Sequence, residues 1–355
     1  MIDELYYDAI DMLKGMIAIP SVSREEKEVA DYIGQLLSSF GLKVNRHGNN
    51  LWCTAPEFDT SKPTLLLNSH IDTVKPAQGW TFEPFNPIEE DDRIYGLGSN
   101  DAGASVVALT AAFRHLCTTD RAYNLILLLS CEEEVSGKNG IESILPLLPE
   151  INVAIVGEPT GMQPAIAEKG LMVLDGEITG VSGHAARAEG INAIYRATEV
   201  IETLKNMKFE KESALLGSIK ITITQIQAGT QHNVIPDMCR IVADVRTTDA
   251  YSNEETLSLI RQSVPLDWCK LTPRSVRLNP SGIDASHPIV QRLITLGCRP
   301  FGSPTLSDQA LMPFPSLKLG PGDSARSHTA DEYIRTCEIR SAIQTYISLL
   351  TTLRI

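Results

Sequence analysis

The sequence lacks the features that mark several classes of protein. No segment approaches about 18 uninterrupted apolar residues, so no membrane-spanning helix is expected. The acidic first residues show no basic region followed by an apolar one, so no signal peptide is expected either. Positive charge is scarce, because 31 Lys and Arg stand against 44 Asp and Glu and leave a formal net charge of −13. Nucleic acids and anionic membranes require a basic surface, and the sequence therefore predicts neither partner.

Paired cysteines are missing as well. The seven cysteines are odd in number and include no Cys-x-x-Cys pair, which favours reduced thiols over a disulfide framework. We therefore expect a cytoplasmic protein. A hydrophobic fraction of 43% and a charged fraction of 21% are ordinary for a globular protein, and 355 residues suffice for more than one average domain.

A short apolar run that ends in polar, chemically versatile side chains stands near the start of the chain. Residues 65–67 predict a buried strand of a parallel sheet, and His70 and Asp72 follow it on the same side of the chain. Ligands of open α/β sheets bind at this end of the strands. A histidine oriented by a carboxylate suits a metal ligand, although a simple hydrogen bond at the strand end is the alternative for this pair alone.

Three further segments repeat this pattern. Asp101 precedes a helix expected over 104–116, where it serves either as an N-cap or as a metal-bridging carboxylate. Glu158 follows the apolar run 153–156 directly. The run 316–319 leads into Gly-Pro-Gly-Asp and on to His328.

The strongest signal is the run Glu132-Glu133-Glu134 at the exit of an apolar strand expected over 124–130. A solvated acidic turn is the alternative interpretation. Carboxylates at the end of a buried strand repel one another and lose hydration unless cations or solvent compensate, so we favour a metal site. Adjacent side chains point in opposite directions, which allows one glutamate to bind metal while its neighbour moves protons.

The first forty residues predict two helices. Apolar residues at helical spacing indicate a helix over 3–19, and Pro20 ends it. Ser23 with Glu26 three residues later matches a capping box, which predicts a second helix from there to Phe40.

The middle of the chain has a different order of expected strands and helices. Strands and helices alternate in the order strand, helix, strand, strand, helix, strand, which predicts a ferredoxin-like α+β unit. The expected ranges begin near 171 and continue at 191–207, 217–227, 238–246, 254–264 and 270–278. Because the ligand-like pattern returns near the C-terminus, residues 171–284 are expected to be an insert in a domain formed by 1–170 and 285–355.

Histidine and carboxylate side chains at several strand ends make a mixed nitrogen and oxygen ligand set of the kind that zinc uses. Five ligands with one shared carboxylate match a two-metal site. The motifs Ser-His-Ile-Asp-Thr-Val, Gly-x-x-Asp-x-Gly, Glu-Glu-Glu-Val-Ser-Gly-x-x-Gly, Gly-Glu-Pro-Thr and Gly-Pro-Gly-(x)₅-His-x-x-Asp-Glu-Tyr occur in that order. With these motifs, over nearly its whole length, the chain resembles the zinc-dependent family of acetylornithine deacetylase, succinyl-diaminopimelate desuccinylase and aminoacylase.

The resemblance implies a role for each of these residues. It implies an α/β catalytic domain with helices around a mostly parallel sheet, two zinc ions that cobalt can replace, and an inserted lid and dimerisation domain. The implied assignments are His70 and Glu158 on the first ion, Glu134 and His328 on the second, Asp101 as the bridge, Asp72 as the residue that orients His70, and Glu133 as the general base. The triple glutamate leaves a second register open, with Glu132 as the base and Glu133 as the ligand. The segment around Asp101 departs from the usual family wording at Ser99, Asn100 and Ala102, without loss of a ligand.

The resemblance also implies residues that contact the substrate. His184 in Gly-His-Ala-Ala matches the lid histidine that stabilises the oxyanion of the partner subunit's site, although alone it reads as a loop histidine. Asn233 and Arg246 match substrate-binding residues, with a surface arginine as the alternative for Arg246. Arg326 is either a clamp for a second carboxylate or a structural arginine of the His328 loop.

The function that the resemblance implies is hydrolysis of the amide bond of an N-acyl amino acid, with N-acetylornithine favoured, a step of arginine biosynthesis. Inside the family the alternatives are a succinyl-diaminopimelate or N-succinylornithine desuccinylase, an aminoacylase and a dipeptidase. The alternative from another functional class is a homologue that binds metal but has no catalytic activity. A small-molecule substrate and a homodimer through the inserted domain complete the expectation.

Overall fold

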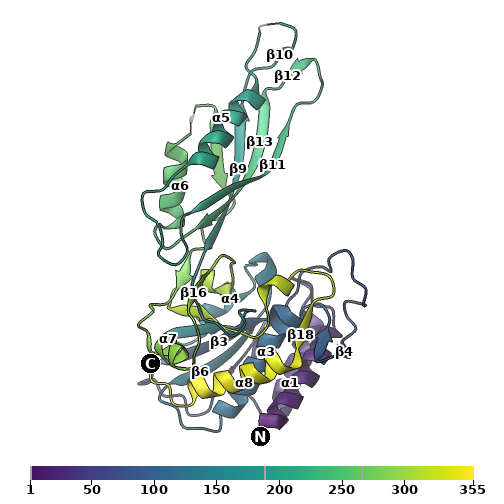
Figure 1. Ribbon diagram of the computed structural model, residues 1–355, viewed down its shortest axis with the longest axis vertical. Helices are drawn as coiled ribbons and strands as arrows, with labels where there is room; N and C mark the ends of the chain where they lie inside the picture. Colours follow the sequence, from purple (N-terminus) through teal and green to yellow (C-terminus); the bar gives the residue numbers. More distant parts are fainter. Residues whose placement is uncertain (1, 188, 265–266) are drawn as a thin grey trace. The chain divides into compact units, whose positions relative to one another are not determined.

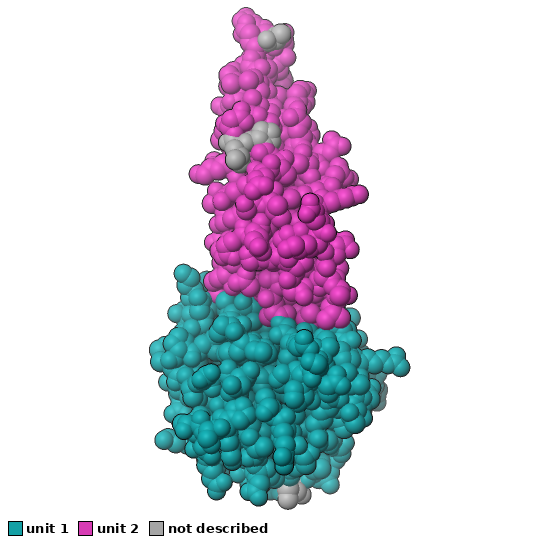
Figure 2. Space-filling view, turned by 90° about the vertical axis from the view of Figure 1, so that its left-hand side faces the viewer, with its two compact units in different colours: residues 1–166, 282–301, 307–355 teal, residues 167–281, 302–306 magenta. Residues whose placement is uncertain are grey.

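The computed structural model describes residues 2–187, 189–264 and 267–355 (Figure 1). These residues divide into two compact units (Figure 2). Unit 1 comprises residues 1–166, 282–301 and 307–355, and unit 2 comprises residues 167–281 and 302–306. In the described ranges no helix is long and apolar enough to cross a membrane.

Unit 1 is organised around a mixed sheet with a parallel centre. The strand order is β1-β2-β6-β3-β7-β17-β8-β15, and β16 pairs with β8. The bounds are β1 Val44–His47, β2 Asn50–Thr54, β3 Thr64–His70, β6 Asn124–Ser130, β7 Val153–Val156, β8 Ala165–Glu168, β15 Ser281–Gly282, β16 Phe301–Ser303 and β17 Ser316–Lys318. The strands β6, β3, β7 and β17 are parallel neighbours, so the predicted α/β fold with a mostly parallel sheet is confirmed.

Both faces of this sheet are covered, which explains its continuous apolar strands. Leu65 and Leu67 of β3 face a large core, and Leu66 faces a smaller core on the opposite side. The helices α1 (Ile2–Ile17), α2 (Lys27–Ser39), α3 (Ala104–Leu116), α7 (Pro288–Thr295) and α8 (Thr336–Leu350) contribute to the large core. In Figure 1, α1, α3 and α8 lie together on one side of the sheet, and α3 contacts both of the others.

Smaller elements complete unit 1. The short helix α4 (Ile141–Ile144) packs into the smaller core. A separate small sheet has the order β18-β5-β4, with β4 Ile88–Glu90, β5 Arg93–Tyr95 and β18 Tyr333–Arg335. Single turns of helix lie at η2 Glu133–Val135, η3 Leu145–Leu147, η4 Asp308–Leu311 and η5 Ser324–Arg326. The segment η1 Ser99–Gly103 is an irregular turn, because Asp101 and Ala102 have non-helical backbone angles.

The predicted capping box at Ser23 is wrong. The helix begins at Lys27, and no side chain caps it. Ser23 instead donates a hydrogen bond from Oγ to Asp72 Oδ2 over 2.6 Å, and its backbone N–H donates to Thr73 O. Segment 21–23 thus lies beside the end of β3. The carboxylate of Asp72 is buried there and requires hydrogen-bond donors, so Ser23 binds it and does not cap the helix.

Unit 2 contains an antiparallel sheet in the order β11-β13-β9-β14. Its main elements are β9 Gly170–Thr179, α5 Ala193–Asn206, β11 Lys220–Ala228, β13 Met238–Thr247, α6 Asn253–Gln262 and β14 Cys269–Pro273. This chain order and strand order are those of a ferredoxin-like unit. The strands β10 (Gly183–His184) and β12 (Val234–Ile235) form a short ladder of their own. The last strand ends at Pro273 and is therefore shorter than the predicted range 270–278, although the N–H of Arg274 still donates to Val173 O of β9 and its guanidinium pairs with Asp175.

Candidate metal centre

The candidate site lies at one edge of the sheet of unit 1, where parallel strands end. His70 is the last residue of β3, Glu132 to Glu134 follow β6, and Glu158 follows β7 by two residues. The loop after β17 carries His328. Carboxyl ends of parallel neighbours meet at the same edge, so the sheet alone brings together four of the segments that the sequence singled out.

His70 is buried at 2% exposure, and its two ring nitrogens have different neighbours. Nδ1 lies 3.0 Å from the backbone O of Asp72 and 3.5 Å from Asp72 Oδ1. Nε2 faces three carboxylates, at 3.2 Å from Asp101 Oδ1, 3.8 Å from Glu158 Oε1 and 4.0 Å from Glu133 Oε2. Burial lowers the pKa of His70, but hydrogen bonds to Asp101 and Asp72 outweigh burial and raise that pKa well above its usual value.

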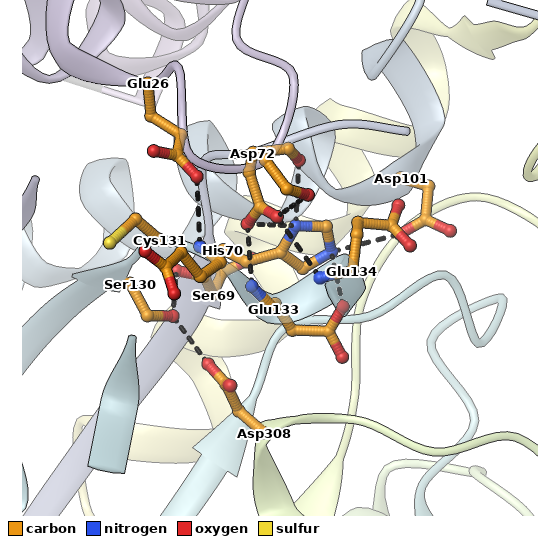
Figure 3. Close-up of polar contacts among 12 residues, drawn as sticks. Glu26, Ser69, His70, Asp72, Asp101, Ser130, Cys131, Glu133, Glu134 and Asp308 are labelled. Carbon is orange, nitrogen blue, oxygen red and sulfur yellow. Dashed lines mark hydrogen bonds and ion pairs between the residues drawn. The ribbon is translucent and has the colours of Figure 1, made fainter. Parts of the chain in front are cut away.

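Asp72 is a rigid support for its neighbours. It is buried, and its carboxylate accepts hydrogen bonds from Ser23 Oγ and from the backbone N–H groups of Glu133 (3.0 Å) and Glu134 (3.1 Å) (Figure 3). Burial acts to raise the pKa of Asp72, but the bonds from His70, Ser23 and Glu133 hold it below its usual value. A charged Asp72 therefore fixes both the imidazole of His70 and the start of the glutamate turn.

The three consecutive glutamates point to different places. Glu132 has a left-handed backbone (φ 56°), and its carboxylate accepts a 2.8 Å hydrogen bond from the side-chain amide of Asn139. Glu133 and Glu134 form the following turn and lie beside His70 and Asp101 in Figure 3. Burial first, and then Glu158 and other nearby carboxylates, raise the pKa of Glu133 well above its usual value.

Asp101 lies between the two histidines. It sits in η1, immediately before α3, and its Oδ1 is 3.2 Å from His70 Nε2. Its other oxygen, Oδ2, is 3.8 Å from Nε2 of His328. His328 Nε2 also lies 3.1 Å from Glu134 Oε1 and 3.0 Å from Glu134 Oε2, and its hydrogen bond with Glu134 raises the pKa of His328 to about 9. One carboxylate with an oxygen toward each histidine is the arrangement of a bridging ligand.

Glu158 completes the side of the site nearest to His70. Its Oε1 has no hydrogen-bond partner among the described residues, and burial raises its pKa to about 8. The preceding Gly157 allows the strand end to approach α3, because a Cβ there would lie 2.8 Å from the Cβ of Ser105.

The residues present fit a bound cation. Ligand atoms of His70, Asp101 and Glu134 all lie within 4.8 Å of one another. A buried carboxylate oxygen without a partner at Glu158, beside three more carboxylates, is costly unless positive charge compensates it. Imidazole and carboxylate donors together suit zinc and similar divalent ions.

Two buried acids near the site were not assigned a role from the sequence. Glu332 accepts hydrogen bonds at Oε1 from the backbone N–H groups of Asn100 and Asp101, at 2.9 Å each. Asp308 accepts a 2.6 Å hydrogen bond from Ser130 Oγ, and burial raises its pKa to about 6. Glu332 lies in the His-x-x-Asp-Glu motif, whereas nothing in the sequence around Asp308 signalled its position.

The expected substrate residues are not part of this cluster. Arg326 of unit 1 is bound by Glu338, with Nη1 and Nη2 at 2.7 and 3.2 Å from its two oxygens. The remaining three belong to unit 2. His184 lies in β10, Asn233 just before β12, and Arg246 in β13, where its guanidinium pairs with Asp244.

Comparison with known proteins identifies the family of the chain. The sequence profile of the family described as Peptidase family M20/M25/M40 matches residues 66–352. A protein named acetylornithine deacetylase from Aliivibrio fischeri is 30% identical over 311 residues, covering 81% of this chain and 80% of its own. One named succinyl-diaminopimelate desuccinylase, from a Nitratiruptor species, is 29% identical over 251 residues, covering 67% and 68%.

Solved structures share the fold. A Bacillus subtilis protein described as a dinuclear metal binding peptidase from the M20 family superposes with a TM-score of 0.76 and 15% sequence identity. The match covers 98% of this chain and 98% of that one.

Proposed function

The chain belongs to peptidase family M20/M25/M40 and is thus a metallohydrolase, and from this we propose that it cleaves the amide bond of N-acyl amino acids, with N-acetylornithine as its substrate. The observation that carries the proposal is Asp101, which directs one oxygen to each of two histidines. Relatives named acetylornithine deacetylase support the choice of N-acetylornithine, and we propose its deacetylation as a step in arginine biosynthesis.

We assign two zinc ions, which cobalt can replace, to this site. His70 and Glu158 would hold the first ion, Glu134 and His328 the second, and Asp101 both. When bound, the ions supply a water of lowered pKa and polarise the acyl carbonyl. In the same assignment Asp72 keeps the proton of His70 on Nδ1, so that Nε2 is free to act as a ligand.

Glu133 is the proposed general base. Its backbone N–H is anchored on Asp72, while its carboxylate lies 4.0 Å from His70 Nε2 and therefore borders the ion site. The raised pKa of Glu133 suits a group that takes a proton from the attacking water and passes it to the leaving amine. Glu132 is assigned no chemistry, because its carboxylate is bound by Asn139.

The residues of unit 2 are proposed to act on the substrate. His184 would donate a hydrogen bond to the developing oxyanion. Its Nδ1 accepts from the backbone N–H of Ala186 over 3.1 Å, which leaves Nε2 as the donor. Asn233 and Arg246 would bind the substrate carboxylate. To do so, the guanidinium of Arg246 would release Asp244, its partner in this structure, and pair with the substrate. For Arg326 we propose support of the His328 loop, because Glu338 binds both of its terminal nitrogens.

A panel of substrates tests this function. With zinc added, kcat/KM for N-acetylornithine should exceed that for N-succinylornithine by about ten- to hundredfold. The reason is that a succinyl carboxylate without a partner in the site loses its hydration, at a cost of roughly 1–3 kcal/mol, whereas an acetyl group carries no charge. Arg326, the cation suggested for that carboxylate, is already paired with Glu338.

The same panel separates the alternatives. Faster turnover of N-succinylornithine or of succinyl-diaminopimelate would replace the proposed substrate by a succinylated one. Preference for acetylated apolar amino acids or for dipeptides would indicate an aminoacylase or a dipeptidase. No turnover of any amide with zinc bound would indicate an idle homologue.

We propose further that the chain forms a homodimer through unit 2, and one variant tests it. Strand β11 lies at an edge of its sheet, and Ile226 on it is 53% exposed. A long edge strand with exposed apolar side chains is a surface that pairs with another chain.

Ile226→Lys should convert the dimer to a monomer at micromolar concentration in analytical ultracentrifugation. The control Ile294→Lys, at a 43% exposed isoleucine of unit 1, should remain dimeric. A monomeric wild type, or a dimeric Ile226→Lys, would contradict the proposal.

A further inference from the structure

Two loops that are far apart in the sequence are joined beside the candidate metal centre. The first is η1, which carries Asp101, and the second is the segment 323–332, which carries His328. The side chain of Asn100 is inserted between them. Its Nδ2 donates to the backbone O of Asp323 (3.1 Å) and to Ser327 Oγ (3.3 Å), and its Oδ1 accepts from the N–H of Asp323 (3.1 Å).

Glu332 makes the reciprocal connection. It belongs to the second loop, is 2% exposed, and accepts at Oε1 from the N–H groups of Asn100 and Asp101. Its backbone O accepts from the N–H of Gly96 over 3.0 Å. Each loop therefore sends one buried side chain onto the backbone of the other, and both connections involve Asn100, the residue before Asp101.

The packing around this double connection is tight and specific. Asn100 is fully buried, and a Cβ at Gly322 (φ 88°) would lie 2.3 Å from its Oδ1. The neighbouring acid Asp331 points elsewhere, because it accepts from the N–H and Oγ1 of Thr81 at 2.8 and 2.7 Å. Of these two neighbouring acids, Glu332 is therefore the one whose carboxylate binds the backbone of η1.

We propose that Asn100 and Glu332 are positioning residues that set the separation of Asp101 and His328 and thereby the affinity for the second metal ion. This inference rests on the proposed two-metal function. Of the other residues of the first site, His70 is the last residue of β3 and Glu158 follows β7, so neither belongs to one of the two loops. The second site depends on the loops, because Asp101 comes from one and His328 from the other.

The expected effect is selective. Removing a group that orients a metal ligand typically lowers metal affinity by about 10–100-fold. Glu332→Ala and Asn100→Ala should each weaken binding of the second ion by about that factor, and leave the first ion within about threefold of wild type. Glu332→Gln keeps an oxygen that can accept from both N–H groups, so it should restore the second affinity to within about threefold. The matched control Asp331→Asn should bind both ions as the wild type does.

Calorimetric titration of the metal-free proteins with Zn²⁺ measures both affinities, and circular dichroism establishes that each variant is folded. Asn100→Ala provides an independent variant if Glu332→Ala does not fold. Turnover by the two alanine variants should recover in excess Zn²⁺, which a residue acting in the chemistry would not allow. Unchanged binding of the second ion in both alanine variants, or equal weakening of both ions, would overturn the inference alone. A wild type that binds fewer than two ions would overturn the proposed function and this inference with it.

Discussion

Replacing Glu133 with glutamine should lower turnover by about 10²–10⁴-fold, the usual contribution of a general base, while both metal ions stay bound. The substitution preserves size and removes only the basic oxygen. The backbone N–H of Glu133 stays bound to Asp72, so the glutamate turn is expected to keep its place. Activity on N-acetylornithine and metal content by plasma emission spectrometry measure the two halves of the prediction.

The neighbouring glutamates are the matched controls. Glu132→Gln should retain both ions and most of its turnover, because the carboxylate of Glu132 is bound by Asn139. Glu134→Gln should lose the second ion, because Glu134 is the carboxylate that faces His328. If Glu132→Gln proved to be the inactive variant that keeps its metal, the register of base and ligand would be wrong by one residue.

Removal of the metal ions should abolish measurable activity, and added Zn²⁺ or Co²⁺ should restore it. The physical reason is the density of negative charge that the ions would compensate. Glu133, Glu134, Glu158 and Asp101 converge around His70 and His328, and burial raises the pKa of Glu158 to about 8. Binding to the folded state alone also stabilises that state, so the metal-free protein should unfold at a lower temperature in calorimetry. Full activity after exhaustive chelation would contradict a metal-dependent reaction.

The position of the site follows from features that a sequence displays. The buried strands ending at His70, Ser130 and Val156 each contain an apolar run, at 65–67, 125–129 and 153–156, and parallel strands place their carboxyl ends together. Residues that follow such runs therefore converge whatever the loops between them do. The roles assigned to those residues remain predictions that the variants above test.

Contacts between distant segments are what the sequence does not display. Ser-x-x-Glu occurs at Ser23 and again at Ser252, and the second forms a true capping box with Glu255. The first does not, because Asp72, 49 residues away, takes the hydroxyl of Ser23. The two serines have the same spacing to a glutamate. They differ because the fold places the buried carboxylate of Asp72 beside Ser23.

Glu332 and Asp308 illustrate the same limit. Each is buried by segments that lie more than a hundred residues away in the chain, and their partners are backbone N–H groups and a serine. Such partners leave no pattern in a single sequence. His184, Asn233 and Arg246, the proposed substrate residues, were indicated only by family resemblance, because polar residues of loops and strand surfaces carry no periodic signal.

Turnover of N-acetylornithine by metal-free protein during a titration with Zn²⁺ tests the central claim most directly. We predict no release of acetate without metal and a rise to full activity as zinc approaches two ions per chain, with Asp101 shared between them. Acetate release without metal would contradict the claim. So would two bound ions with no hydrolysis of any N-acyl amino acid.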